Sequence, residues 1–192
     1  IVVIARTDPH AVRQDVYDAH PDWIAVDKED KKRRHWSNPN LWVTCALGPY
    51  NFSFMTEVHK EIMSSYHIEG IFTNRWTGHG ICYCEHCQRN FRDAYGIELP
   101  RSDDPKDSEY RSYLLWRTQR LRELWLLWDD EIRNINPNAR FIQNGFPDMK
   151  IIGELADIFF VDYQGRSGFS LPWEIGKRVK EYRATMGSKP IG

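Results

Sequence analysis

The sequence predicts an α/β fold built on a parallel sheet. Short apolar runs alternate with amphipathic segments along nearly the whole chain of 192 residues. The apolar runs are continuous rather than alternating between apolar and polar positions, which is typical of strands covered on both faces. The repeated order of strand and helix is that of folds in which crossover helices cover a parallel sheet.

Six apolar runs are predicted to form the strands. Each run is rich in Val, Ile, Phe or Trp and ends in polar residues or in a turn that contains Gly or Pro. The clearest of them ends at Asp162. The predicted strands are residues 1–5, 23–27, 41–47, 68–74, 140–144 and 156–162.

The segments between these strands carry apolar residues at helical spacing. Asp8 followed by Pro9 predicts the start of the first helix, Thr56 the cap of the second, and Gly96 the end of the third. The fourth and longest helix has one broad apolar stripe and ends before Pro137. The predicted helices are residues 9–19, 56–66, 85–95, 110–135, 149–155 and 173–186, with polar linkers at 28–34 and 97–107.

Doubly wound sheets and closed barrels share this pattern, and periodicity does not separate them. About five to six β/α units in this length suit a segment of an eight-unit barrel, which usually needs ~250 residues. We therefore predict that residues 1–192 are a partial (β/α)8 TIM barrel, cut at both ends.

The composition is that of an ordinary globular domain. The formal net charge is −1, so nothing points to a polyanionic partner, and no apolar stretch approaches the ~20 residues that span a bilayer. We expect neither nucleic acid nor a membrane as a partner. The lack of a visible targeting signal favours the cytoplasm, and homo-oligomerisation through the full-length chain stays open.

All four cysteines point to one metal site. Cys82, Cys84 and Cys87 lie within six residues, and Cys45 is the fourth. Zn²⁺ takes four thiolates in a tetrahedron, and a Cys-x-Cys-x2-Cys loop supplies three of them at small backbone cost. We therefore predict a structural Zn²⁺ cofactor. Four thiolates would leave no open position for a catalytic water.

Other roles for these thiols stay open. A Cys-x2-Cys pair can act as a redox dithiol, although that role needs no third and fourth thiol. Disulfides suit a secreted protein, yet a chain of this length can bury a core without them. His86 lies inside the motif and could replace one thiolate as a ligand.

Polar and aromatic side chains follow the predicted strands. In parallel α/β folds the ligand site lies at the carboxyl ends of the strands. Such residues can bind the vicinal hydroxyls of a sugar, and aromatic faces can stack on its ring. The predicted substrate-binding residues are Arg6, Asp8, Asn74, Arg75, Trp76, His79, Asn144, Tyr163 and Gln164.

Asp162 is the predicted catalytic carboxylate, because it follows a buried strand and would project into the mouth of the barrel. The structural alternative is that Asp162 holds an arginine across the rim. Glycoside cleavage normally uses two carboxylates. Asp8 is the weaker second candidate, and the true partner could also lie outside this segment.

In the segment 69–100 the predicted strand end at 70–74 leads into Cys82, Cys84 and Cys87. This segment resembles the barrel domain of the family 42 β-galactosidases and of hydrolase-like relatives near α-amylases and fucosidases. In that group one cysteine from an earlier strand end joins a Cys-x-Cys-x2-Cys loop to bind zinc, and Cys45 matches it. The resemblance covers most of the chain, with decreasing specificity away from the cysteines.

One departure from that family concerns catalysis. The β-galactosidases carry an Asn-Glu pair whose Glu is the acid/base, whereas this chain has Asn74 followed by Arg75. The resemblance therefore implies no acid/base at this position. The other catalytic carboxylate of the β-galactosidases lies on strand seven, beyond Gly192.

These observations favour a glycoside hydrolase or hydrolase-like enzyme of carbohydrate metabolism that cleaves O-glycosyl bonds with carboxylates. The alternatives are a catalytically silent barrel that binds carbohydrate and a zinc-stabilised interaction domain.

Overall fold

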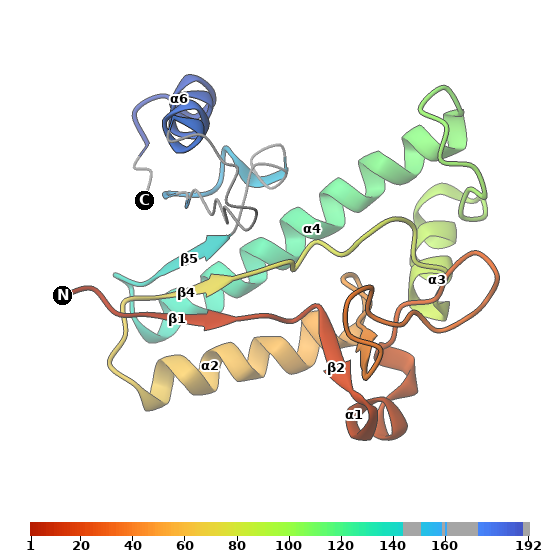
Figure 1. Cartoon of the computed structure of the whole chain (residues 1–192), viewed down its shortest axis with the longest axis horizontal. Helices are drawn as coiled ribbons and strands as arrows, with labels where there is room; N and C mark the ends of the chain where they lie inside the picture. The colour runs from red at the N-terminus through yellow and green to blue at the C-terminus, as the bar shows by residue number, and fades with distance from the viewer. Residues whose placement is uncertain (144–150, 159, 161–172, 190–192) are drawn as a thin grey trace.

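A three-stranded parallel sheet forms the centre of the protein. The computed structural model describes residues 1–143, 151–158, 160 and 173–189. Strands β1 (Ile4–Thr7), β4 (Gly70–Thr73) and β5 (Arg140–Gln143) pair in the order β1-β4-β5. They form an open arc within the described part (Figure 1), and no closed barrel is seen there. The parallel α/β class predicted from the sequence is confirmed.

Two helices cover the same face of this sheet. Phe141 of β5 contacts both His59 of α2 (Thr56–Ser65) and Trp128 of α4 (Ser108–Ile135), with ring centroids 5.7 and 5.3 Å apart. Ile71 at the centre of β4 is completely buried. Burial of these large apolar side chains is the main stabilising contribution to the fold.

The predicted long helix is confirmed as α4. Asp107 caps it by accepting a hydrogen bond from the Glu109 N–H (2.9 Å), and it ends at Ile135, before Pro137. Its apolar stripe buries Tyr113, Trp116, Leu121, Leu124, Trp125, Trp128 and Ile132. Among the described helices, none is both long and apolar enough to cross a membrane.

The predicted first helix is partly wrong. Strand β2 (Ala11–Arg13) replaces its first half, and helix α1 (Gln14–Ala19) is its second half. Strand β2 pairs antiparallel with β3 (Leu41–Val43), so only the first three residues of the predicted strand 41–47 form a strand, and they lie in this small sheet and outside the parallel sheet. Tertiary pairing outweighs the helical spacing here, because β2 buries Val12 by pairing it with Trp42.

Several other boundaries also differ from the prediction. Segment 23–27 makes only isolated bridges, such as Ile24 with Thr44. Thr56 does not cap α2, because a π-helical turn, Tyr50–Met55, runs directly into it, and the Thr56 hydroxyl donates to the Phe52 carbonyl (3.1 Å). This wider turn is not visible in a pattern of period 3.6.

The remaining helices follow the sequence expectations more closely. Helix α3 (Glu85–Tyr95) ends at Gly96 with a left-handed φ of 69°. Helix α6 spans Glu174–Met186. The predicted helix 149–155 is described from 151 onward, where the first two residues are helical, and most of the predicted strand end 159–162 lies outside the described residues.

Gly70 is required where β4 meets β5. A Cβ at this position would lie 2.4 Å from the Arg140 carbonyl oxygen. Because this oxygen belongs to the backbone of a paired strand, it cannot move aside as the end of a flexible side chain can. We predict that Gly70→Ala lowers the free energy of unfolding by about 1–3 kcal/mol, measured by urea denaturation.

Gly176→Ala is the matched control. Gly176 lies in α6, and an added Cβ there meets no described atom within 4 Å. Helix propensity should make this change stabilising by about 0.5–1 kcal/mol. Equal effects of the two substitutions would contradict the proposed backbone clash.

Candidate metal centre and strand-end cluster

Cys45, Cys82, Cys84 and Cys87 form one cluster, here named the cysteine cluster. Their four Sγ atoms all lie within 4.8 Å of one another, and Cys45 Sγ is 3.5 Å from both Cys84 Sγ and Cys87 Sγ. A tetrahedral ion with metal–sulfur bonds of about 2.3 Å holds its sulfurs about 3.8 Å apart. The cluster therefore has the donor set and the spacing of a tetrathiolate metal site.

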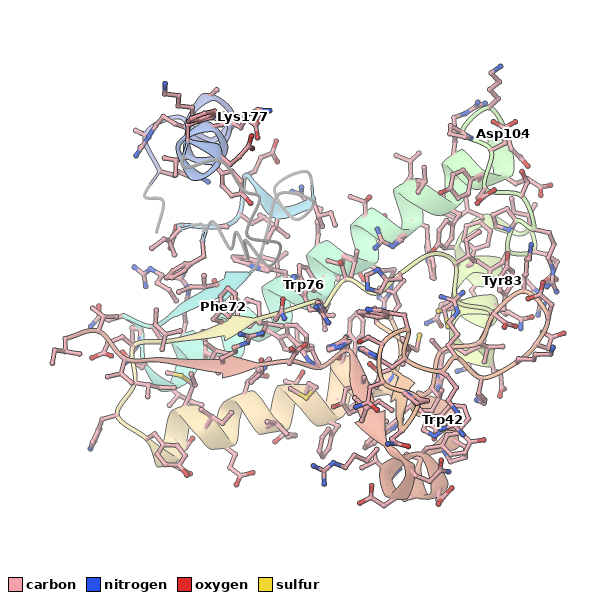
Figure 2. The ribbon with its side chains drawn as sticks, viewed as in Figure 1. Trp42, Phe72, Trp76, Tyr83, Asp104 and Lys177 are labelled. Atoms are coloured by element: carbon pink, nitrogen blue, oxygen red, sulfur yellow. The ribbon has the colours of Figure 1, made fainter. Side chains whose placement is uncertain are left out.

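The small sheet positions the first of these ligands. Cys45 follows β3, and its N–H donates to the Trp23 carbonyl (2.7 Å). Residues 82–84 form an irregular loop that is tied to the same segment, because the Tyr83 N–H donates to the Val26 carbonyl (3.0 Å). The loop leads directly into α3, whose first turns carry Cys87. Figure 2 shows Tyr83 beside this helix.

Hydrogen bonds between the thiols shift their pKa values in opposite directions. Hydrogen bonds to Cys82 hold its pKa well below the usual range of a thiol; the largest contribution comes from Cys45 and smaller ones come from Cys84 and Cys87. The Val26 N–H also contacts Cys82 Sγ (3.4 Å). The same network raises the pKa of Cys45, with Cys82 as the largest cause. Without a cation, four thiolates this close repel one another, so a metal ion is the partner that would let all four ionise.

The loop before the cysteines is tied down by donors from outside it. Arg33 donates to the carbonyls of His79 (2.5 Å) and Ile81, and Arg117 donates to the Thr77 carbonyl (2.8 Å). Both arginines border a cavity of about 20 Å³ beside the cysteines. This volume holds about one water molecule.

A second group of polar residues gathers at the carboxyl ends of β1 and β4. The parallel register places Thr7 opposite Thr73, so that Asp8 and Asn74 leave their strands side by side. Asn74 Nδ2 donates to Asp8 Oδ2 (3.1 Å). We name this group the strand-end cluster: Arg6, Asp8, His10, His35, Asn74 and Arg75.

Two histidines extend the cluster away from Asp8. His10 Nδ1 bonds Asp8 Oδ1, and His10 Nε2 lies 3.0 Å from His35 Nε2. His35 Nδ1 accepts the backbone N–H groups of Ser37 and Asn38, each at 3.2 Å. His35 must therefore carry its proton on Nε2 and donate it to His10, which in turn donates from Nδ1 to Asp8. The result is a directional chain of hydrogen bonds that ends on a carboxylate.

The cluster keeps Asp8 ionised. Burial alone would raise the pKa of Asp8, but the hydrogen bonds from His10 and from the Asn74 amide, together with the Arg6 guanidinium (3.6 Å), lower it. Burial lowers the pKa of His35, and the neighbouring Arg75 guanidinium lowers it further. An ionised carboxylate of this kind can serve as a base or as an electrostatic partner, and it is a poor proton donor.

Arg75 and Trp36 form the outer part of this site. Arg75 has a left-handed φ of 54°, its Nη1 lies 3.5 Å from His10 Nε2, and its guanidinium carbon lies 5.2 Å from the centroid of the Trp36 ring. Trp36 stacks on His35 with centroids 4.0 Å apart, yet it is 57% exposed. His79 meets the edge of the same indole at 5.0 Å, and burial, followed by its cationic neighbours, lowers the pKa of His79.

The structure brings together part of the predicted substrate-binding set. Arg6, Asp8, Asn74 and Arg75 lie in the strand-end cluster, and His79 adjoins it through Trp36. Trp76 lies between the end of β4 and α4, only 1% exposed and 6.0 Å from Trp128 (Figure 2). The remaining predicted residues, Asn144, Asp162, Tyr163 and Gln164, lie outside the described residues.

Sequence reasoning did not find His10, His35 and Trp36. His10 could have been found, because it follows Asp8 by two residues at a strand end. His35 and Trp36 directly follow the predicted polar linker 28–34, and no local signal links His35 to His10 at a strand end 25 residues away.

Comparison with known proteins supports the fold. No protein-family model matches the chain, and no curated protein matches it. Among solved structures, a β-galactosidase from the haloarchaeon Halorubrum lacusprofundi is 18% identical, with a TM-score of 0.67, over 97% of this chain and 36% of its own. A β-galactosidase from Bacillus circulans is 17% identical, with a TM-score of 0.67, over 92% of this chain and 32% of its own.

A third solved structure is an α-L-fucosidase isoenzyme from Paenibacillus thiaminolyticus, with 19% identity and a TM-score of 0.61 over 82% of this chain and 23% of its own. The chain thus spans only about a quarter to a third of the solved proteins it matches. At these identities the likeness concerns the fold: an α/β segment of the kind found in glycosidase barrels, together with a four-cysteine cluster suited to a metal.

The hydrogen-bond chain makes a prediction for nuclear magnetic resonance. At neutral pH, imidazole ¹⁵N shifts should show the His10 proton on Nδ1 and the His35 proton on Nε2. Asp8→Ala should release His10 from this tautomer, because its acceptor is lost, whereas Asp15→Ala, in the exposed part of α1, should leave both rings unchanged. A wild-type His10 protonated on Nε2 would contradict the assignment.

Proposed function

We propose that this chain is part of the (β/α)8 barrel of a glycoside hydrolase or hydrolase-like protein that acts on O-glycosyl bonds. The observation that carries the proposal is the strand-end cluster, because enzymes of this fold place their active sites at the carboxyl ends of the strands. The likeness to solved β-galactosidases and an α-L-fucosidase supports it. Carbohydrate is the proposed partner.

The cysteine cluster would hold Zn²⁺ in this proposal. All four ligands are thiolates, so a zinc ion there has a closed tetrahedral shell and a structural role. It would fasten the loop between β4 and α3 to the small sheet that carries Cys45. Asn74 and Arg75 of the strand-end cluster lie on the same loop and would be positioned by this attachment.

Catalysis is assigned to carboxylates. Asp162 is the proposed principal carboxylate, because it directly follows an apolar run in the sequence and lies where a strand of the proposed barrel would end. Asp8 is the second candidate, with a lowered pKa that suits a base or a charge stabiliser. Glycoside cleavage also needs a proton donor, which would come from another residue.

A silent saccharide-binding barrel is the second candidate function. It is favoured by Arg75, which stands where the β-galactosidases carry their acid/base Glu. A glycoside hydrolase and a silent barrel would both bind sugar, but only the hydrolase would turn over a glycoside. A test of glycoside hydrolysis by the intact protein therefore separates them.

Zinc binding can be tested by elemental analysis of protein purified without chelator. We expect about one zinc per chain, a sulfur-only first shell in X-ray absorption, and loss of the metal in Cys82→Ser, because three thiolates no longer close the tetrahedron. Removing the metal should lower the melting temperature. His86→Ala is the control that should retain zinc, and loss of the metal in that variant would make His86 the ligand instead.

The role of Asp162 can be tested on a panel of aryl glycosides. With the intact protein, Asp162→Asn should reduce kcat/KM by at least ~10²-fold at an unchanged melting temperature, because general acid/base contributions have this size. Asp130→Asn, on an exposed position of α4, is the matched control. Full activity in a folded Asp162→Asn protein would remove Asp162 from the mechanism.

A further inference from the structure

We propose that Arg75 binds the carboxylate of an acidic sugar, so that the glycoside recognised by this barrel contains a uronic acid. The inference rests on the proposed function, because it names the substrate class of that same site. It depends on three features of the strand-end cluster and its surroundings: a guanidinium with no ion pair to any described residue, a backbone that fixes its place, and the exposed indole of Trp36 beside it.

The first feature is the charge of Arg75. Among the described residues, no carboxylate lies within ion-pair distance of its guanidinium. Asp8 is the acidic group of the cluster, and it is already engaged by His10, Asn74 and Arg6.

The contact of Arg75 with His10 leaves most of its donors uncommitted. The two groups are 3.5 Å apart, and the His10 Nε2 lone pair already accepts from His35 at 3.0 Å. A guanidinium has five N–H donors in a planar fork that fits a carboxylate with two parallel hydrogen bonds. Arg75 is thus a half-buried cation that can still bind an anion.

The second feature is the backbone. Arg75 is one of two described non-glycine residues with positive φ, at 54°, a conformation that L-residues other than Asn and Asp rarely adopt. The residues on either side keep it there: the Asn74 N–H donates to Thr7 (3.0 Å), and Arg117 holds the Thr77 carbonyl (2.8 Å). Strain maintained at a strand end is typical of residues that position ligands.

The third feature is Trp36. More than half of this side chain is accessible, at 57%, although one side is supported by the His35 ring. The C–H face of a sugar ring packs well on such an indole. The Arg75 guanidinium carbon is 5.2 Å from the indole centroid, so a carboxylate one bond away from a stacked sugar ring lies within its reach.

The surrounding field also favours an anion. Arg33 and Arg117 bind backbone carbonyls of residues 77–81, and neither makes an ion pair within the described part of the chain. Together with Arg75 they form a positively charged border along this loop. Such a field attracts anionic ligands and weakens with salt.

The test is calorimetric titration of the intact protein with methyl glycosides of glucuronic and galacturonic acid and of their neutral parents, glucose and galactose, as both anomers. We expect at least one acidic sugar to bind about tenfold tighter or more than its neutral parent, and the preference to shrink with added salt. This comparison in the wild-type protein needs no variant.

Arg75→Asn then tests the residue itself. Asn tolerates positive φ, so the change removes the charge with little backbone cost. It should weaken acidic-sugar binding about ten- to hundredfold, the size of a charge-assisted hydrogen bond, and leave neutral sugars within about twofold. Arg75→Lys should retain part of the preference. Arg34→Gln is the matched control, because Arg34 also contacts an indole, that of Trp42 at 3.4 Å, away from the strand ends.

The outcomes separate this inference from the proposed function. Equal binding of acidic and neutral sugars, or an acidic preference that survives in Arg75→Asn, overturns the role of Arg75 and leaves the glycoside function standing. Failure of every sugar to bind overturns both.

Discussion

The site depends on the register of the parallel ladder between β1 and β4. Thr7 pairs with Thr73, and the two hydroxyls lie 2.8 Å apart while His59 of α2 contacts the first of them at 3.1 Å. This pairing leaves Asp8 and Asn74 as neighbours at the first position beyond the sheet. A shift of this register by one residue would turn Asp8 to the opposite face of the sheet. It would also separate the Asp8 carboxylate from the Asn74 amide that donates to it. The close approach of β5 at Gly70 holds the ladder from its other side.

A second constraint acts on the loop between β4 and α3. Residues 74–84 contain no helix or strand, and much of their hold on the protein comes from hydrogen bonds by Arg33, Arg117 and Tyr113 to their carbonyls. The thiols at the end of this loop face Cys45 of the small sheet. A metal there would replace hydrogen bonds between thiols by four metal–sulfur bonds. The loop then has one end on the sheet and the other on a metal, with Arg75 between them.

The predictions that the structure confirms are those that rest on local signals in the sequence. The cysteine spacing, the apolar stripe of α4 and Gly96 at the end of α3 each depend on residues close in sequence, and all three are found in the structure. Strand β2 was not predicted, because its pairing with β3 joins residues far apart in the sequence. Val12 of β2 pairs with Trp42 of β3, 30 residues away. His35 joins the site by a contact across 25 residues. Pairings of this kind are set by tertiary packing and leave no periodic trace in the sequence.

Helix α4 connects these two constrained regions. Its 28 residues extend for about 42 Å, from the side of α3 to the back of the sheet (Figure 1). Near its start the Tyr113 hydroxyl donates to Gly80 of the loop (3.1 Å), and near its end Asp129 accepts from the Phe141 N–H of β5 (3.4 Å). The first part of this continuous helix therefore contacts the irregular loop, and its last part contacts the central sheet. Its amide hydrogens should exchange with solvent fastest in the first turns and slowest beside the sheet, so that protection along this helix reports how firmly the loop is held.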